Sequence, residues 1–108
     1  MKLVRNSILP PKSHKLLTLW PYIFVRKETR VYEPDVRHES IHGEQQKEML
    51  IVLFLLWYGL EWLVRLIIYR NAHKAYKMIG FEQEAYLNEL DKDYLKRRKR
   101  YAWIKYIV

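Results

Sequence analysis

The pattern of hydrophobic and polar positions divides the chain into three regions. In the first, residues 1–34, short runs of aromatic and β-branched residues occupy positions 20–25 (WPYIFV) and 30–32 (RVY). Such runs favour strands, and the polar residues at 27–29 separate them. We therefore expect the two runs to pair as a small N-terminal β-hairpin.

The second region, residues 35–79, has the character of a long helical segment. Pro34 and Asp35 favour a helix start at about residue 35, because proline is tolerated in the first turn and aspartate is a good N-cap. The run of residues at 49–60 then contains no charged side chain. These features predict one dominant helix in the middle of the chain.

The uncharged run at 49–60 has three interpretations. A bilayer-spanning helix needs about 20 apolar residues, so a buried core helix is favoured. Residues expected to pack inside are Leu53, Phe54, Leu56 and Trp57. If Glu61 and Arg65, which are four residues apart, pair with each other, the apolar stretch at 49–69 reaches spanning length. Association with a membrane surface, or a true span, therefore remains an alternative.

The third region, residues 80–108, begins at Gly80, which is expected to end the preceding helix. One or two further helices are expected after it. A run of five basic residues supplies most of the imbalance behind the net charge of +8: Lys96, Arg97, Arg98, Lys99 and Arg100. We expect this run on the surface, as the solvated face of a helix. Binding to an anionic membrane surface or to nucleic acid is the alternative.

Length and composition narrow the remaining choices. A chain of 108 residues, half of them hydrophobic, is expected to form one domain with a real core. The chain has no cysteine, which excludes disulfides and a thiolate nucleophile. The N-terminus lacks the long apolar segment of a signal peptide. A cytoplasmic location is favoured, with peripheral attachment to a membrane as the alternative.

The sequence HESIH at residues 38–42 carries the candidate chemistry. Two histidines four residues apart leave the same face of a helix, so one Zn²⁺ can bind both His38 and His42. Glu39 is then placed to act as general base on a metal-bound water. Gln45 lies one turn further on the same face and is a candidate hydrogen-bonding support for the ligands. The alternative is a partly exposed helix start that happens to contain two histidines.

A zinc site of this kind needs a third protein ligand. The acidic and apolar segment after Gly80 offers Glu82, with Glu84 as the competing candidate, because two residues at i and i+2 point to different helix faces. Neither His14 nor His73 has a motif around it. We interpret His14 as an ordinary loop or strand residue and His73 as a surface helix residue.

The combination of H-E-x-x-H with a later helical E-x-x-A resembles the gluzincin class of zinc metallopeptidases. In size the chain is similar to the minigluzincins and to small uncharacterised bacterial metalloprotease-like proteins. The resemblance covers roughly residues 34–90 and implies a mainly helical α+β, zincin-like domain. It assigns the third zinc ligand to Glu82 and places Tyr86 where the family has an aspartate that supports a ligand. It also suggests that the N-terminal strand at 20–25 lines the cleft, where a substrate backbone would add as a further strand.

Two functions of different classes follow. The first is a minimal zinc peptidase in which Glu39 activates water against a peptide bond, with a protein partner as one way to complete the cleft. The second is a non-catalytic, basic binding or structural protein with a degenerate metal site. It would be peripheral to a membrane, associated with nucleic acid, or part of a larger assembly.

Overall fold

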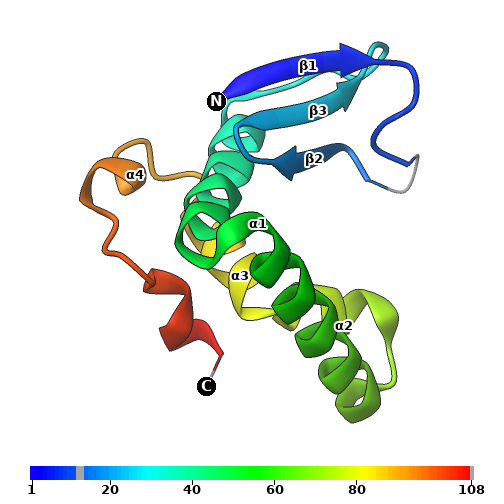
Figure 1. The fold of residues 1–108 in the computed structure, drawn as a ribbon, viewed down its shortest axis with the longest axis vertical. Coiled ribbons are helices and arrows are strands. Elements are labelled where there is room, and N and C mark those ends of the chain that lie inside the picture. Colours follow the sequence, from blue (N-terminus) through cyan, green and yellow to red (C-terminus); the bar gives the residue numbers. More distant parts are fainter. Residues whose placement is uncertain (12–13, 108) are drawn as a thin grey trace.

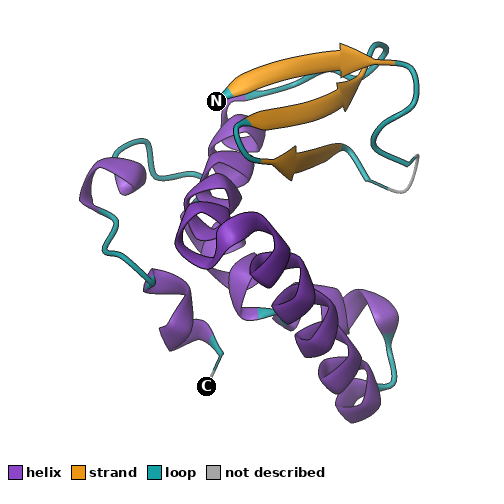
Figure 2. Cartoon of the chain, in the orientation of Figure 1, coloured by secondary structure: helices purple, strands orange, loops and turns teal. Residues whose placement is uncertain are grey.

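The computed structural model describes residues 1–11 and 14–107. A three-stranded sheet lies at one end of the molecule, and a long helix runs from it past several shorter helices (Figures 1 and 2). This arrangement confirms the expected mainly helical α+β fold.

The sheet consists of β1 (Lys2–Asn6), β2 (Leu16–Leu19) and β3 (Tyr22–Arg26), in the order β1-β3-β2. Strand β1 runs parallel to β3, and β2 runs antiparallel to it. The predicted hairpin between the runs at 20–25 and 30–32 is therefore wrong in its pairing. The first run contains β3, which instead pairs with β2 through a tight turn, and residues 30–32 form no strand.

Side-chain burial explains this pairing. Alternate residues of β2 and β3 point to one face of the sheet, where Leu16, Ile23 and Val25 form a buried cluster. Val31 packs against that cluster from the following segment. The apolar residue of the 30–32 run thus serves as cover for the sheet and does not extend it.

Helix α1 (Glu33–Tyr69) begins two residues before the predicted start. The side chain of Asp35 accepts a hydrogen bond from the backbone N–H of Tyr32 at 3.0 Å, and Pro34 occupies the first turn. The helix is interrupted at Leu50, whose φ of 56° and ψ of 144° lie outside the helical region. Residues other than glycine rarely adopt these backbone angles. Two helical halves, 33–49 and 51–69, meet at this kink.

The shorter helices pack along one side of α1. They are α2 (Ala72–Met78), α3 (Gly80–Asn88), α4 (Tyr94–Arg97) and the 3₁₀ helix η1 (Ala102–Tyr106). Gly80 begins α3 and contacts η1 so closely that a Cβ there would come within 2.8 Å of the Ile107 side chain. The main apolar cluster, formed by Phe54, Ile79, Phe81 and Trp103, lies where α1, α3 and η1 meet.

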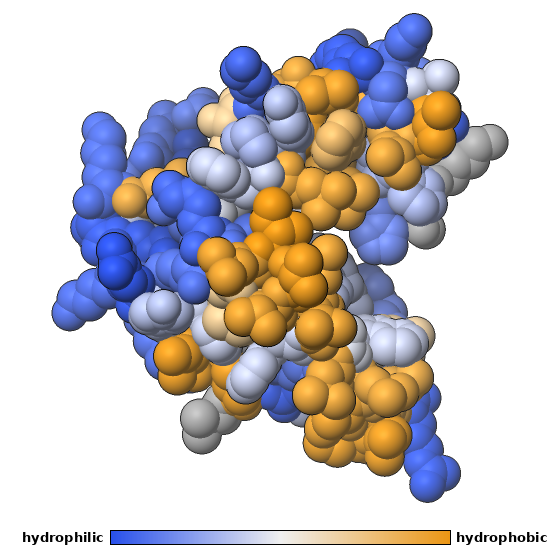
Figure 3. Space-filling model, viewed as in Figure 1, coloured by the Kyte–Doolittle hydropathy of each residue, from blue (hydrophilic) through white to orange (hydrophobic). Residues whose placement is uncertain are grey.

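The expectation that the uncharged run packs inside is largely wrong. Phe54 is buried at 4% exposure, whereas Leu53 and Leu56 are exposed at 51% and 65%, and Trp57 is also exposed. The shorter helices cover only the side of α1 that carries Phe54. Figure 3 shows the uncovered side chains as a continuous hydrophobic band along the second half of α1.

The expectation that the whole basic run lies on the surface is wrong at one residue. Lys96, Arg97, Lys99 and Arg100 are exposed. The side chain of Arg98 is only 4% exposed and forms ion pairs with Glu48 at 2.8 Å and Glu84 at 2.5 Å. These two carboxylates compensate the buried guanidinium, which is why this one member of the run turns inward.

Candidate metal centre and catalytic cleft

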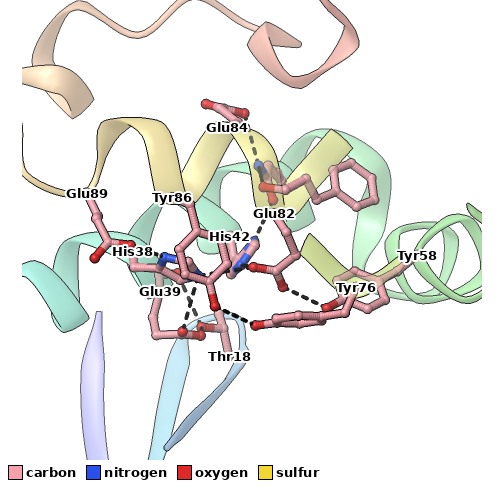
Figure 4. A network of polar contacts seen from close by, with 12 residues as sticks. Thr18, His38, Glu39, His42, Tyr58, Tyr76, Glu82, Glu84, Tyr86 and Glu89 are labelled. Carbon is pink, nitrogen blue, oxygen red and sulfur yellow. Dashed lines mark hydrogen bonds and ion pairs between the residues drawn. The ribbon is translucent and has the colours of Figure 1, made fainter. Parts of the chain in front are cut away.

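The two histidines of the HESIH segment project from the first half of α1 towards α3. Their ring centroids are 4.9 Å apart. The Nε2 atoms of His38 and His42 each lie 3.1 Å from Oε1 of Glu82, which comes from the first turn of α3 (Figure 4). Three candidate ligand atoms therefore converge on one point between the two helices.

The orientation of the His42 ring is fixed by Gln45. The amide nitrogen of Gln45 donates to the backbone carbonyl of Phe81 at 3.0 Å and to the carboxylate of Glu84 at 2.9 Å. Its amide oxygen must therefore face His42, and it accepts a hydrogen bond from Nδ1 at 2.7 Å. This leaves Nε2 of His42 directed at Glu82, the arrangement that metal-binding histidines use. Gln45 thus makes a hydrogen bond to His42, while its predicted role as support for a metal ligand stays a prediction.

The orientation of the His38 ring is fixed by Glu89. Nδ1 of His38 donates to Oε1 of Glu89 at 2.8 Å, so Nε2 points to Glu82. Glu89 follows the last turn of α3, seven residues after Glu82, and both face α1. The ring of Tyr86 packs edge-on against His38 with centroids 4.5 Å apart. Tyr86 therefore contacts His38 by packing, and Glu89 supplies the carboxylate contact to its ring.

The electrostatics of the three groups are coupled. Burial alone would lower the pKa of His42, but the Glu82 carboxylate against its Nε2 raises it to about 9. Burial alone would raise the pKa of Glu82, but His42 and His38 hold it well below its usual range. The other oxygen of Glu82 accepts a hydrogen bond from the Tyr58 hydroxyl at 2.7 Å. Glu82 is therefore ionised, and both of its carboxylate oxygens have hydrogen-bond partners.

The donor set fits a zinc ion. Two bonds of about 2.1 Å at a tetrahedral angle place neighbouring ligand atoms about 3.4 Å apart, close to the spacing found here. A hydrogen bond joins His42 and Glu82 where a divalent cation would contact both. The residues that would hold Zn²⁺ are His38, His42 and Glu82.

Glu39 stands beside these three groups and is held by the sheet. The hydroxyl of Thr18, in β2, donates to Oε1 of Glu39 at 2.6 Å. The other oxygen, Oε2, lies 4.0 Å from Nε2 of His38. His38, Glu39 and His42 together form a group whose ligand atoms lie within 4.8 Å of one another. Glu39 is thus farther from the histidines than Glu82 is, and its free oxygen is placed for proton transfer.

The site opens into a cavity of about 770 Å³. Its wall contains His38 and Glu39, and beyond them Gly59 and Trp62 of the second half of α1. The hydroxyls of Tyr76 and Tyr86, which also line the cavity, are 3.1 Å apart. The cavity therefore extends from His38 along the apolar half of α1.

The strand that borders this cavity is β2. Leu16 lines it, and Thr18 lies in the adjoining recess with His42 and Glu82. The prediction that the strand at 20–25 lines the cleft is wrong, because that strand is the centre of the sheet and β2 is the edge next to α1. Gln46 ties this edge down: its amide donates to the Thr18 carbonyl and its oxygen accepts from the Trp20 N–H.

Glu84 lies away from the histidines. Its carboxylate accepts hydrogen bonds from Gln45, the Tyr94 hydroxyl and Arg98, and it is completely buried. Of the two candidates for the third ligand, the structure thus brings only Glu82 to the histidines. His14 and His73 are both exposed and line the outer cavity.

Sequence reasoning missed Thr18, Tyr58, Tyr76 and Glu89. Glu89 carried a usable signal, because it lies seven residues, or two helical turns, after Glu82. The other three come from separate elements and carried none.

Comparison of the chain with protein-family models, with curated proteins and with solved structures finds no match.

Proposed function

We propose that this protein is a zinc-dependent hydrolase that cleaves peptide bonds. The observation that carries the proposal is the convergence of Nε2 of His38, Nε2 of His42 and Oε1 of Glu82, with Glu39 beside them on the cavity side. Two histidines and a carboxylate, with one position left open, are the donor set of catalytic rather than structural zinc sites.

The roles of the chain's own residues follow from their contacts. Bound Zn²⁺ supplies Lewis acidity, which lowers the pKa of water and polarises a carbonyl group. Glu39 accepts the proton of the attacking water through Oε2, because Thr18 already occupies Oε1. The proton then passes to the leaving amine as the carbon–nitrogen bond breaks. An extended peptide lies in the cavity beside β2, where Leu16 forms part of the wall.

The first test is metal content. The purified full-length chain is expected to contain one zinc per molecule by elemental analysis. His42→Ala is expected to lose it, since two of three ligands do not hold zinc at a catalytic site. His73→Ala is the matched control, because His73 is an exposed histidine of the same cavity, and it should keep the metal. Zinc retained by His42→Ala, or absent from the unaltered chain, would overturn the proposal.

The second test separates catalysis from binding. Glu39→Gln should keep the zinc and the fold while abolishing hydrolysis, because an amide cannot accept the water's proton. Thr18 can still donate to the amide oxygen, so the local geometry is preserved. The measurement is turnover of an unbiased peptide library together with zinc content. Full activity in Glu39→Gln would rule out Glu39 as the base, and a zinc-bound but inert unaltered chain would favour the non-catalytic alternative.

A further inference from the structure

The second half of α1 carries a wide hydrophobic surface that none of the elements in the described part of the chain covers. We call it the apolar arc. Its nine aliphatic members are each between 47% and 69% exposed: Val52, Leu53, Leu55, Leu56, Leu60, Leu63, Val64, Ile67 and Ile68. A window of 18 residues in this helix has a mean hydropathy of 2.0, and only 6% of it is buried. The core helix of a water-soluble domain would be mostly buried, so this surface needs another explanation.

The width of the apolar arc indicates what covers it. With about 100° between successive residues, the arc extends over about 220° from Leu55 to Ile68. A helix that packs on one partner needs an apolar stripe of about 100°. Any single partner helix would therefore leave much of the arc exposed. Lipid acyl chains surround a helix and can cover all of it.

The two charged residues of this segment are withdrawn from the apolar arc. Glu61 accepts a hydrogen bond from the Gly80 N–H at 2.8 Å, and Arg65 donates to the Ile107 carbonyl at 2.7 Å. They also pair with each other at 3.3 Å. Their partners on α3 and beside η1 place both charges on the side that faces the protein. The outward side is consequently free of charge along its whole length.

Basic residues border the segment at both ends. Lys47 precedes the kink, and Arg70 and Lys74 follow the last turn, all three exposed. Together with the net charge of +8, this distribution complements the anionic headgroups of the membrane surface from which the helix enters. Trp57 lies on the arc, and an exposed indole of this kind suits the boundary between headgroups and acyl chains.

We propose that the apolar arc is embedded in the hydrocarbon region of a lipid bilayer, entered from one side. The position of α2 favours embedding over a full crossing. The backbone carbonyl of Ala72 accepts a hydrogen bond from Trp62, and Lys74 stacks on the ring of Tyr69, so α2 runs back along the same half of α1. A crossing would draw the exposed ammonium groups of Lys74 and Lys77 into hydrocarbon. The proposal does not depend on the metal site.

Flotation with vesicles tests the proposal. The full-length chain, transferred from detergent to neutral phosphatidylcholine vesicles, is expected to float with them at about 1 M NaCl, where the screening length is only about 3 Å. The triple variant L56Q/L60Q/I67Q should lose this salt-resistant fraction, since the three side chains are exposed and contribute little to the core. The matched control K96Q/R97Q/R100Q removes exposed charge from the basic run and should float like the unaltered chain.

Two outcomes would overturn the proposal. One is salt-resistant flotation of L56Q/L60Q/I67Q. The other is an unaltered chain that remains dispersed without vesicle binding, including as a stable oligomer that covers the arc. A measurement on the intact fold guards against a misfolded variant: brominated acyl chains should quench the tryptophan fluorescence of the unaltered chain more than that of Trp57→Phe. Equal quenching of the two would also count against embedding.

Discussion

At the scale of single residues, the candidate metal centre rests on a few contacts that decide where protons lie. Gln45 and Glu89 each accept a hydrogen bond from Nδ1 of a histidine, and this directs both Nε2 atoms at Glu82. The positions of His38, Glu39, His42 and Glu82 could be anticipated, because helical spacing and the E-x-x-A pattern are local signals. Thr18 could not be anticipated, because its place depends on how the sheet docks on α1.

The prediction at this scale concerns the pH dependence of stability. The pKa of His42 is raised from 6.5 to about 9 in the folded, metal-free protein, so folding favours its protonated form. That stabilisation is fully present below about pH 6.5 and is lost as the pH rises through about 9. We expect the melting temperature of the metal-free chain, measured with a chelator in mild detergent, to fall over this interval.

The control for this experiment is His42→Gln, which removes the titrating group and should flatten the curve between pH 6.5 and 9. A metal-free chain whose melting temperature stays constant across that interval would contradict the proton-linked contact between His42 and Glu82.

At the scale of elements, the shorter helices are joined to α1 by buried charge as well as by apolar packing. Arg98, after α4, forms ion pairs with Glu48 of α1 and Glu84 of α3, and the Tyr101 N–H also donates to Glu48. The sequence shows five consecutive basic residues with no sign that one differs from the rest. Which member turns inward depends on where two distant carboxylates lie, and this is information that only tertiary structure contains.

The prediction at this scale compares two arginines of the same run. Arg98→Met leaves Glu48 and Glu84 buried without a cation, and breaking a buried pair in this way typically costs about 3–5 kcal/mol. Arg100→Met, the matched control, alters an exposed side chain and should change stability by less than about 0.5 kcal/mol. Denaturant unfolding measures both. Similar losses of unfolding free energy in the two variants would show that the buried ion pairs of Arg98 do not contribute more to stability than an exposed arginine.

At the scale of the whole molecule, the cavity and the apolar arc are neighbours. Gly59 lines the cavity, while Leu55 and Leu63, one turn before and one turn after it, belong to the arc. The uncharged run was expected in the core because a small chain needs apolar side chains inside. Of this run only Phe54 is buried, where it joins Ile79, Phe81 and Trp103 in the main apolar cluster. Which residue of the run is buried depends on which side of α1 the later helices cover.

The prediction at this scale concerns Gly59. A Cβ added there meets no atom within 4 Å, so Gly59→Phe should be accommodated by the fold and should fill part of the cavity. Replacing a glycine inside a helix generally raises stability by up to about 1 kcal/mol. We therefore expect a slightly higher melting temperature together with a higher KM for peptide substrates. Gly59→Ala is the control, because it gains the helical preference without filling the cavity.

An unchanged KM in Gly59→Phe, with zinc content intact, would show that substrate does not use this part of the cavity.

The kink at Leu50 has a consequence for how the two halves of α1 are aimed. In an unbroken helix each residue turns the side-chain direction by about 100° around the helix axis. The directions of His38 and His42 would then fix the direction of every later side chain. One residue with non-helical dihedral angles resets this phase. The direction in which the site faces and the direction in which the lipid-facing side faces are therefore set independently. For a protein seated in a bilayer, Leu50 thus determines whether the mouth of the cleft tilts towards the headgroups or towards open water.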